Sequence, residues 1–394
     1  MKRILMISPG VLPVPAVRGG AVETLMETIL RHNAKSREYQ IDLIGRSHPR
    51  IEKDQYKNTT LHLYQSFLFA RGADRLVYYF YEWVLKDWRS MFHANRFQAK
   101  GYRRLIEKTL RNNACDYILV ENNMSLLGAV RACLGEEEYS RKCVFHMHSN
   151  YIDAPAAVPD MLACRMIIAV SAYVKDVLVN KYGFPAEMIR VLRNGVALEP
   201  FQTSGEENIR QKYGLQENDF VFLYAGRISP EKGLLELVNS FASVKDSGAK
   251  LLVAGGCFPA KKNVYAQKVI KAAQGNPNIV FCGAVGYANM PSYYKAADAL
   301  ALPTTTGEAG SLTLIEGMSA GLRIVATDKG AIPEYAGGHA VLVPPGDAFV
   351  EGLAKALCDT LRRGRMPEGE RDAIREHVKQ YSDAVFYQNF TKLL

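Results

Sequence analysis

Two glutamates frame a short run of small residues in the second half of the chain. Glu308 and Glu316 stand eight positions apart, and a helix-like run follows over 312–321. An apolar stretch over 299–303 precedes them, which is the expected position of a ligand site beyond the carboxyl end of a strand in an open α/β sheet. Amides at the start of such a helix attract an anion such as a diphosphate. Eight helical residues rise about 12 Å, which would place one carboxylate near a sugar and the other near the ribose of one nucleotide-sugar. The alternative is a pair of ordinary acids on a surface helix.

A second candidate site is the turn that follows the apolar stretch at 220–225. It opens with Gly226 and Arg227, closes with Lys232 and Gly233, and leads into an amphipathic run over 234–244. Glycine lets the backbone approach a ligand, and the two cations suit a phosphate. The turn lacks the Gly-Lys-Ser/Thr ending of a P-loop, which argues against an ATPase. Solvated cations on a plain strand–loop–helix are the alternative interpretation.

The elements that must position these residues form an alternating pattern. A chain of 394 residues is expected to divide into about two domains. Apolar runs of strand length alternate with helical ones, at 4–8, 41–45, 117–121, 143–148, 166–171, 220–225, 250–255, 279–282, 299–303 and 324–327. Such runs predict an α/β protein with parallel sheets covered on both faces. A polar connector at 199–205 separates an expected first domain, 1–200, from a second, 201–380, and a last helix over 381–394.

Composition excludes several classes of protein. Apolar residues make up 48% and charged residues 23% of the chain, as in ordinary soluble proteins, and no apolar run reaches the length of a membrane span. The four apolar residues at 4–7 are too few for a signal peptide, and the seven scattered cysteines include no Cys-x-x-Cys pair. Both features predict a cytoplasmic protein with reduced thiols. Without an Asp-x-Asp motif, we expect protein cations and no metal at a leaving diphosphate, and no cofactor.

One segment, 46–112, carries most of the positive charge. It holds 14 Lys/Arg and 6 Asp/Glu of a chain whose net charge is +9, and its aromatics include Trp83, Trp88, Phe92, Phe97, Tyr102 and the run 78–81. A helical pair with a buried aromatic face and a solvated basic face is the plainest interpretation. The alternative is contact with an anionic acceptor or the inner membrane surface; binding to nucleic acid is not expected.

In their order along the chain, these motifs resemble glycosyltransferase family 4. The resemblance rests on the turn at 226–233, the Glu308–Glu316 pair and the sequence Gly-Ala-Ile-Pro-Glu at 330–334. In the first half it rests on the glycine loop before Glu23, the histidine-ended strand at 143–148, and the segments 168–171 and 193–196. It implies a retaining enzyme with the GT-B fold, in which two doubly wound, Rossmann-like domains face a central cleft. It also implies that the C-terminal helix crosses back to the first domain.

The resemblance assigns roles to individual residues. The implied catalytic set is Arg227 and Lys232 on the diphosphate, Glu308 against the sugar, and His148 beside the reacting centre. The implied donor-binding set is Glu316 on the ribose, Val285 near the base, and Gly19, Gly20, Gly226, Gly310, Ser311 and Leu312 around the phosphates and sugar. His146 faces the same way as His148 on a strand, so the choice between them follows the family pattern. Ser311 and Ala331 stand where the family commonly has glycine.

The sequence therefore predicts a transferase that uses a nucleotide-sugar, with UDP-linked hexose or N-acetylhexosamine as the expected donor. A saccharide, a lipid-linked saccharide or a small molecule is the expected acceptor. Front-face displacement, in which the leaving phosphate takes the acceptor proton, is the preferred route to retention. A nucleotide-sugar epimerase and a non-catalytic coat component remain alternatives, whereas an NAD dehydrogenase would need the Gly-x-Gly-x-x-Gly motif that the chain lacks.

Overall fold

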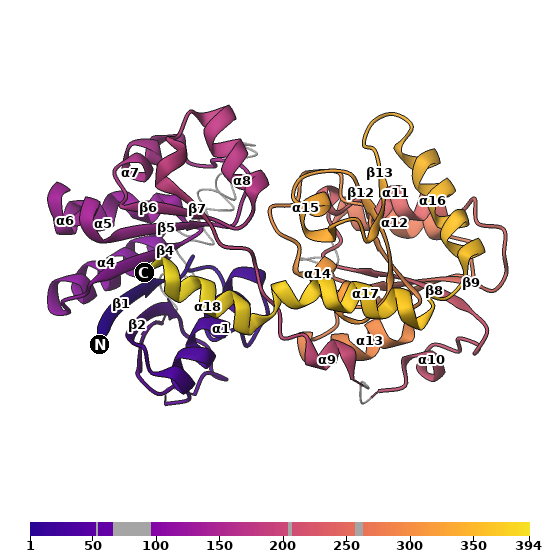
Figure 1. Ribbon diagram of the computed structural model, residues 1–394, viewed down its shortest axis with the longest axis horizontal. Helices are drawn as coiled ribbons and strands as arrows, with labels where there is room; N and C mark the ends of the chain where they lie inside the picture. Colours follow the sequence, from indigo (N-terminus) through magenta and orange to yellow (C-terminus); the bar gives the residue numbers. More distant parts are fainter. Residues whose placement is uncertain (53, 66–95, 204–206, 257–262) are drawn as a thin grey trace. The chain divides into compact units, whose positions relative to one another are not determined.

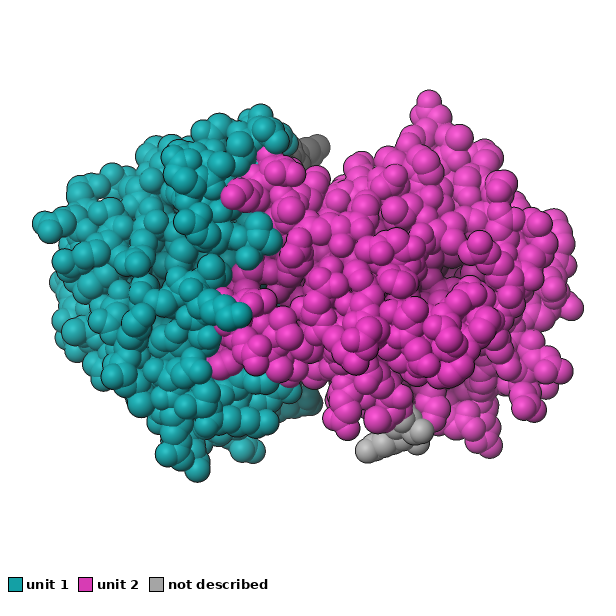
Figure 2. All heavy atoms as spheres, viewed as in Figure 1, with its two compact units in different colours: residues 1–169, 178–191, 391–394 teal, residues 170–177, 192–390 magenta. Residues whose placement is uncertain are grey.

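The computed structural model describes residues 1–52, 54–65, 96–203, 207–256 and 263–394. These residues form two compact units, which Figure 2 colours separately. The first unit comprises residues 1–169, 178–191 and 391–394, and the second comprises 170–177 and 192–390. The boundary between the units, at residues 191 and 192, thus lies a few residues before the polar connector at 199–205. The short piece 170–177 belongs to the second unit.

The first unit is built on a parallel sheet of seven described strands. Their order across the sheet is β3 (Thr59–Tyr64), β2 (Tyr39–Arg46), β1 (Lys2–Ile7), β4 (Tyr117–Glu121), β5 (Cys143–Met147), β6 (Met166–Ala169) and β7 (Ile189–Val191). The connecting helices include α1 (Ala21–Ser36), α4 (Arg96–Asn112), α5 (Leu127–Leu134), α6 (Glu136–Lys142) and α7 (Val158–Leu162), as Figure 1 shows. The order reverses between β1 and β4, and the loops after these two strands therefore flank the switch point of the sheet.

The second unit repeats this arrangement with six described strands. Their order is β10 (Ile279–Gly283), β9 (Ala249–Ala254), β8 (Phe220–Ala225), β11 (Ala299–Leu302), β12 (Arg323–Thr327) and β13 (Ala340–Val343). The helices are α8 (Ala172–Asp176), α9 (Glu199–Gln202), α10 (Ile209–Lys212), α11 (Leu234–Phe241), α12 (Val264–Ala273), α13 (Met290–Ala296), α14 (Leu312–Ser319), α15 (Ile332–Ala336), α16 (Phe349–Arg363) and α17 (Glu368–Val378). Here the switch point lies between β8 and β11, directly before the two segments with the candidate donor residues.

Burial on both faces explains why the strands are almost wholly apolar. All six residues of β8 are buried. Val221 and Leu223 belong to one core together with Leu314 of α14, whereas Phe222 and Tyr224 belong to the core on the opposite face. Successive side chains of a strand point to opposite faces, so in a strand covered on both sides most positions are apolar.

The ten predicted strands are all present, and the GT-B fold is confirmed. The last helix, α18 (Asp383–Leu393), ends in residues that belong to the first unit. There the Leu394 carbonyl accepts hydrogen bonds from Lys2 Nζ at 2.7 Å and from the Tyr117 hydroxyl. The sequence did not predict β3, β7 or β13.

The basic segment 46–112 is not a simple helical pair. It contains an edge strand, β3, which pairs in parallel with β2, before helix α4 begins. Tyr102 on α4 is buried, and its hydroxyl donates to the carbonyl oxygens of Ser8 and Ile44, each at 3.0 Å, so this aromatic belongs to the core. Trp83, Trp88, Phe92 and the run 78–81 lie outside the described residues. No helix within the described ranges has both the length and the apolar character of a membrane span.

Candidate functional site

The loop after β8 carries the first predicted cation on its surface. The Arg227 side chain is 73% exposed and pairs with Glu231 at 3.2 Å. Its backbone is fixed, because the Tyr224 hydroxyl donates to the Arg227 carbonyl at 2.6 Å. Gly226 lies against the next loop so closely that a side chain at Gly255 would overlap with the Gly226 carbonyl oxygen. A solvated guanidinium on an anchored loop is available to grip an anion bidentately.

The second predicted cation and the first glutamate are direct partners. Lys232 Nζ donates to Glu308 Oε1 at 2.6 Å, with the two side chains 29% and 19% exposed. The residues are 76 positions apart in the chain, so the contact exists only because the loops after β8 and β11 meet at the switch point. The structure thus brings together two residues that the sequence singled out separately.

Main-chain contacts hold these two loops against each other. The Glu231 carbonyl accepts from Thr304 Oγ1 at 2.8 Å and from the Thr305 amide at 3.0 Å. Gly233 has a φ of 67°, and a Cβ there would overlap with the Pro303 carbonyl oxygen. Only glycine fits that position, for both reasons. The Lys232–Glu308 geometry therefore rests on a rigid scaffold.

A third loop, after β12, joins this group and adds a cation that the sequence analysis missed. Glu308 forms an isolated parallel bridge with Gly330, and its carbonyl accepts from the Ala331 amide at 2.8 Å. Lys329 Nζ donates to the Thr305 carbonyl at 2.9 Å. The pattern that could have revealed it is a lysine next to a glycine just after an apolar strand, as in the turn at 226–233.

The start of helix α14 is shaped by residues from distant parts of the second unit. Ser171 Oγ donates to the Ala309 carbonyl at 2.6 Å, and Asn194 Nδ2 donates to the Gly310 carbonyl at 3.0 Å. Ser311 caps the helix by accepting from the Leu314 amide at 3.3 Å. Among the described residues, no hydrogen bond is donated by the amides at 310–312. Unpaired amides at the positive end of a helix dipole are groups that can attract an anion.

The second glutamate is buried, unlike the first. Glu316 is 5% exposed and accepts a hydrogen bond at 2.6 Å from the Tyr294 hydroxyl. Burial raises the pKa of its carboxyl group, although hydrogen bonds from Tyr294 and Tyr287 oppose the rise. Val285 follows β10 at the same edge of the sheet and is partly buried against the core. All predicted donor residues of the second half therefore lie at or next to the carboxyl edge of one sheet.

In the first unit, the predicted glycine loop precedes helix α1. Gly19 and Gly20 have φ angles of 71° and 110°, and a Cβ on Gly20 would overlap with the Glu23 carboxylate. Glu23 is 5% exposed. Burial raises its pKa against two backbone hydrogen bonds, and nearby Glu121 raises it further. The backbone of this loop needs glycine because other residues rarely adopt these angles.

The predicted histidine lies in a buried cluster with a carboxylate that the sequence analysis did not single out. His148 Nε2 lies 2.8 Å and His146 Nδ1 lies 3.0 Å from the same oxygen of Glu121, at the end of β4. The Asn122 side chain accepts from the His148 amide at 2.9 Å, and the Asn122 amide donates to the His146 carbonyl, also at 2.9 Å. The expected strand pairing of β4 with β5 would have placed Glu121 beside His146, because the two residues are register partners.

Two members of this cluster have shifted pKa values. Burial opposes ionisation of Glu121, but the neighbouring imidazoles outweigh it and lower the pKa of the carboxyl group to about 2. Burial and His146 lower the pKa of His148 to about 4 despite the opposing effect of Glu121. An ionised carboxylate only accepts hydrogen bonds, so the neutral His148 ring carries its proton on Nε2 and a lone pair on Nδ1.

These three side chains are also the described group that could hold a metal ion. Their ligand atoms lie within 4.8 Å of one another, and two imidazoles with a carboxylate suit a transition metal. The His148 contact at 2.8 Å fits a hydrogen bond, whereas neither ring nitrogen of His146 has a hydrogen-bond partner among the described residues. The donor residues of the second unit include no such group among those that the structure describes, and metal independence stays a prediction.

Comparisons with known proteins agree with this architecture. Residues 19–200 match the family model described as Glycosyltransferase Family 4, and residues 205–373 match the one described as Glycosyl transferases group 1. Lipopolysaccharide 1,2-N-acetylglucosaminetransferase of Salmonella typhimurium is 28% identical over 67% of this chain and 74% of its own length. A glycosyltransferase from Rickettsia africae has a TM-score of 0.76 at 18% identity and covers 100% of this chain and 97% of its own. HepE of Anabaena, solved in complex with UDP, has a TM-score of 0.72 at 18% identity, covering 100% and 99%.

Proposed function

Because the chain belongs to glycosyltransferase family 4 and is a glycosyltransferase, we propose that it transfers a hexose or N-acetylhexosamine from a UDP-linked donor to a hydroxyl of a saccharide acceptor. Transfer proceeds with retention of configuration and without a metal ion. The observation that carries this proposal is the contact between Lys232 and Glu308 at 2.6 Å beside the free amides at 310–312.

The diphosphate binds to the cations and amides of the second unit. As the bond to the sugar breaks, negative charge grows on the phosphate oxygens, so fixed positive groups stabilise the transition state more than the ground state. Arg227 grips two oxygens with its planar guanidinium, and Lys232 adds a compact charge that Glu308 holds in place. Glu316 receives the ribose hydroxyls, and the segment near Val285 receives the base.

Front-face displacement accounts for retention. Glu308 is already engaged with Lys232, and a carboxylate paired with an ammonium is a weak nucleophile. The leaving phosphate takes the proton of the acceptor hydroxyl while the same face of the sugar receives the new bond. A covalent glycosyl-enzyme on Glu308, trapped and located by mass spectrometry, would contradict this route.

His148 binds a hydroxyl group as an acceptor. Its Nε2–H is committed to Glu121 at 2.8 Å, so the lone pair on Nδ1 is the group left to receive a hydroxyl proton from the sugar. Gly19 and Gly20 are the donor-binding residues that we propose in the first unit.

The acceptor is a saccharide of a cell-surface glycolipid or polysaccharide, and N-acetylglucosamine is the first donor sugar to test. Support comes from the Salmonella relative, whose name specifies transfer of N-acetylglucosamine to lipopolysaccharide. The basic segment 46–112, with 14 Lys/Arg and 6 Asp/Glu, suits an acceptor that carries phosphate or a position at an anionic membrane surface.

A donor panel tests the proposal. The protein is incubated in EDTA with UDP-glucose, UDP-N-acetylglucosamine or GDP-mannose, and its melting temperature and the release of nucleotide are followed. A ligand that binds only the folded protein raises its stability in a saturable manner, so one UDP-sugar is expected to do so and to release UDP slowly. Lack of response to every nucleotide would favour a coat component, and conversion of the donor to an epimer without release of UDP would favour an epimerase.

A further inference from the structure

A pocket, here called the second-unit pocket, lies at the sheet edge opposite to the donor loops. Asp298 and Leu322 line it and directly precede β11 and β12, and Glu217, which also lines it, lies three residues before the start of β8. Parallel strands begin at one edge and end at the other, so this pocket and the donor loops lie at opposite ends of the strands. Tyr294, which lines the pocket, also donates to Glu316 at 2.6 Å. Its volume of about 490 Å³ is in the range of small-molecule sites.

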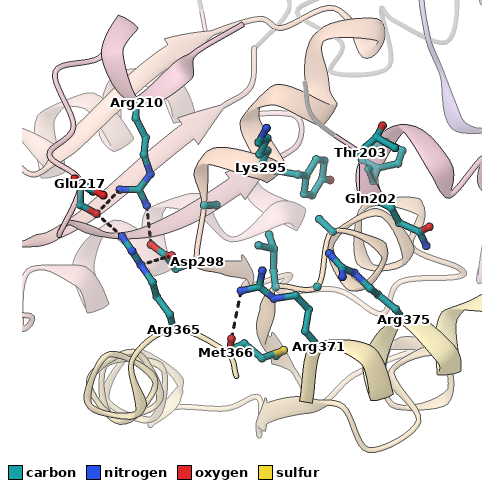
Figure 3. A pocket seen from close by; sticks show the side chains of 16 residues that line it. Gln202, Thr203, Arg210, Glu217, Lys295, Asp298, Arg365, Met366, Arg371 and Arg375 are labelled. Atoms are coloured by element: carbon teal, nitrogen blue, oxygen red, sulfur yellow. Dashed lines mark hydrogen bonds and ion pairs between the residues drawn. The ribbon is translucent and has the colours of Figure 1, made fainter. Parts of the chain in front are cut away.

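One wall of the pocket is already neutralised. Asp298 accepts from Arg210 Nη2 at 2.9 Å and pairs with Arg365 Nε at 3.1 Å, as Figure 3 shows. Both guanidinium groups also donate to main-chain carbonyls between 216 and 219. These contacts fix the two arginines as part of the structure and leave them little capacity for a ligand.

The wall formed by helix α17 is less fully neutralised, although Arg371 Nη2 donates to the Met366 carbonyl at 3.2 Å, as Figure 3 shows. The Nε atoms of Arg371 and Arg375 are buried, and neither has a hydrogen-bond partner among the described residues. Their ion pairs with Glu368 are long, at 3.9 and 3.4 Å, and Glu368 itself is 68% exposed. Arg375 also approaches Asp372, at 4.0 Å. Each side chain as a whole is partly exposed, at 34% for Arg371 and 26% for Arg375, and both line the pocket, so an anion there would reach the guanidinium groups at their other nitrogens.

Two neighbouring features define the rest of the site. Arg371 lies over Gly321, where an added Cβ would overlap with the arginine side chain, so the glycine gives it access to the pocket. Lys295 of α13 is exposed, and no ion pair or hydrogen bond of its side chain is found within the described part of the chain. It lines the same pocket and adds a third cation.

Apolar side chains complete the lining. Phe201 and Tyr294 meet edge to face with ring centroids 5.3 Å apart, and Leu322 and Met366 also line the pocket. A ligand that fills this space therefore has an apolar or ring portion next to its anionic group.

We propose that this pocket is a binding site for a small phosphate monoester, separate from the donor site. The guanidinium groups of Arg371 and Arg375 receive the dianionic phosphate, since planar guanidinium forks match phosphate oxygens bidentately. Lys295 balances the second charge, and the organic part of the ligand lies against Phe201 and Met366.

Calorimetric titration with phenyl phosphate tests the site, because this probe joins a dianion to a ring. The protein is first saturated with UDP, and ionic strength is held constant with sodium chloride. We expect one binding event in the wild type and a loss of about tenfold in affinity for each guanidinium removed in Arg371→Gln/Arg375→Gln. The matched control is Lys268→Gln/Lys271→Gln, which removes two exposed cations of α12 and leaves affinity unchanged.

Absence of binding in the wild type, or equal binding by the Arg371→Gln/Arg375→Gln variant, overturns the proposal. A second measurement needs no variant: phenylglyoxal labels arginines, and mass spectrometry locates the label. Phenyl phosphate is expected to protect Arg371 and Arg375 from labelling but not the exposed Arg227. Labelling of Arg371 and Arg375 that is unchanged by phenyl phosphate would also overturn the proposal. Both measurements report phenyl phosphate binding and not sugar transfer, so their outcome does not depend on the proposed transferase activity.

Discussion

Replacing Lys232 by alanine separates the catalytic role of this side chain from its part in the fold. The ammonium group lies 2.6 Å from Glu308, and the two side chains are 29% and 19% exposed. A partly solvated ion pair contributes about 1 kcal/mol or less to stability. Loss of a positioned positive group at the site of developing phosphate charge costs about 10²–10³ in turnover, or about 3–4 kcal/mol. The variant should therefore be nearly as stable as the wild type and almost inactive.

The assay measures both quantities on the same preparations. UDP release from the donor that the panel identifies gives turnover, and urea unfolding at 25 °C gives the free energy of unfolding. Lys212→Ala is the matched control, because Lys212 pairs with Glu207 at 2.8 Å in the same unit, with both side chains 43% exposed. The reasoning is refuted if Lys232→Ala keeps more than about a tenth of the turnover, or if the control loses as much.

Three further perturbations have defined outcomes. Glu316→Ala is expected to weaken UDP binding by roughly tenfold to a hundredfold, because ribose hydrogen bonds to a charged group are lost; unchanged affinity in a calorimetric titration would remove this carboxylate from the donor site. Gly233→Ala should lower the free energy of unfolding by more than about 2 kcal/mol, since both the φ of Gly233 and the Pro303 carbonyl oppose a side chain. Gly19→Ala should lower it by only about 1 kcal/mol, because Gly19 has open space around it. Equal losses in urea unfolding of the two variants would contradict the close approach of Gly233 to Pro303. The free energy of unfolding should fall by roughly 3 kcal/mol as pH drops from 6.5 towards 4. The reason is that the unfolded chain binds a proton that folded His148, with a pKa of about 4, does not. In His148→Gln, urea unfolding should show a weaker dependence of this free energy on pH, and an unchanged dependence would exclude His148 as its origin.

Most of the fold was predictable because buried parallel strands carry a continuous apolar signal. The strands that the sequence did not reveal are short or lie at edges. β7 has only three residues, one of them Arg190, which is too few to stand out. β13 lies at the edge of its sheet, and three of its four residues are only partly buried. β3 is an edge strand whose residues are only partly buried, and it lies in a segment dominated by charge. Its pairing with β2 is a tertiary fact that composition does not express.

The candidate site was predictable where local pattern carries the signal, and not where distant residues supply the support. Arg227, Lys232 and Glu308 stand in glycine-bearing turns after strands, and the turn itself marks them. Asn194 gives no such sign, because its role is a hydrogen bond to Gly310, 116 positions away. Glu121 closes an apolar strand and is conspicuous only once β4 and β5 are paired in register.

The central claim is that side-chain cations and main-chain amides of the second unit neutralise the departing diphosphate. The most direct test is the initial rate of UDP release in excess EDTA, compared with the rate after dialysis against manganese. The account predicts equal rates in both conditions and a loss of about 10²–10³ in Lys232→Ala in either one. A wild-type rate that disappears with EDTA and returns with manganese would contradict it.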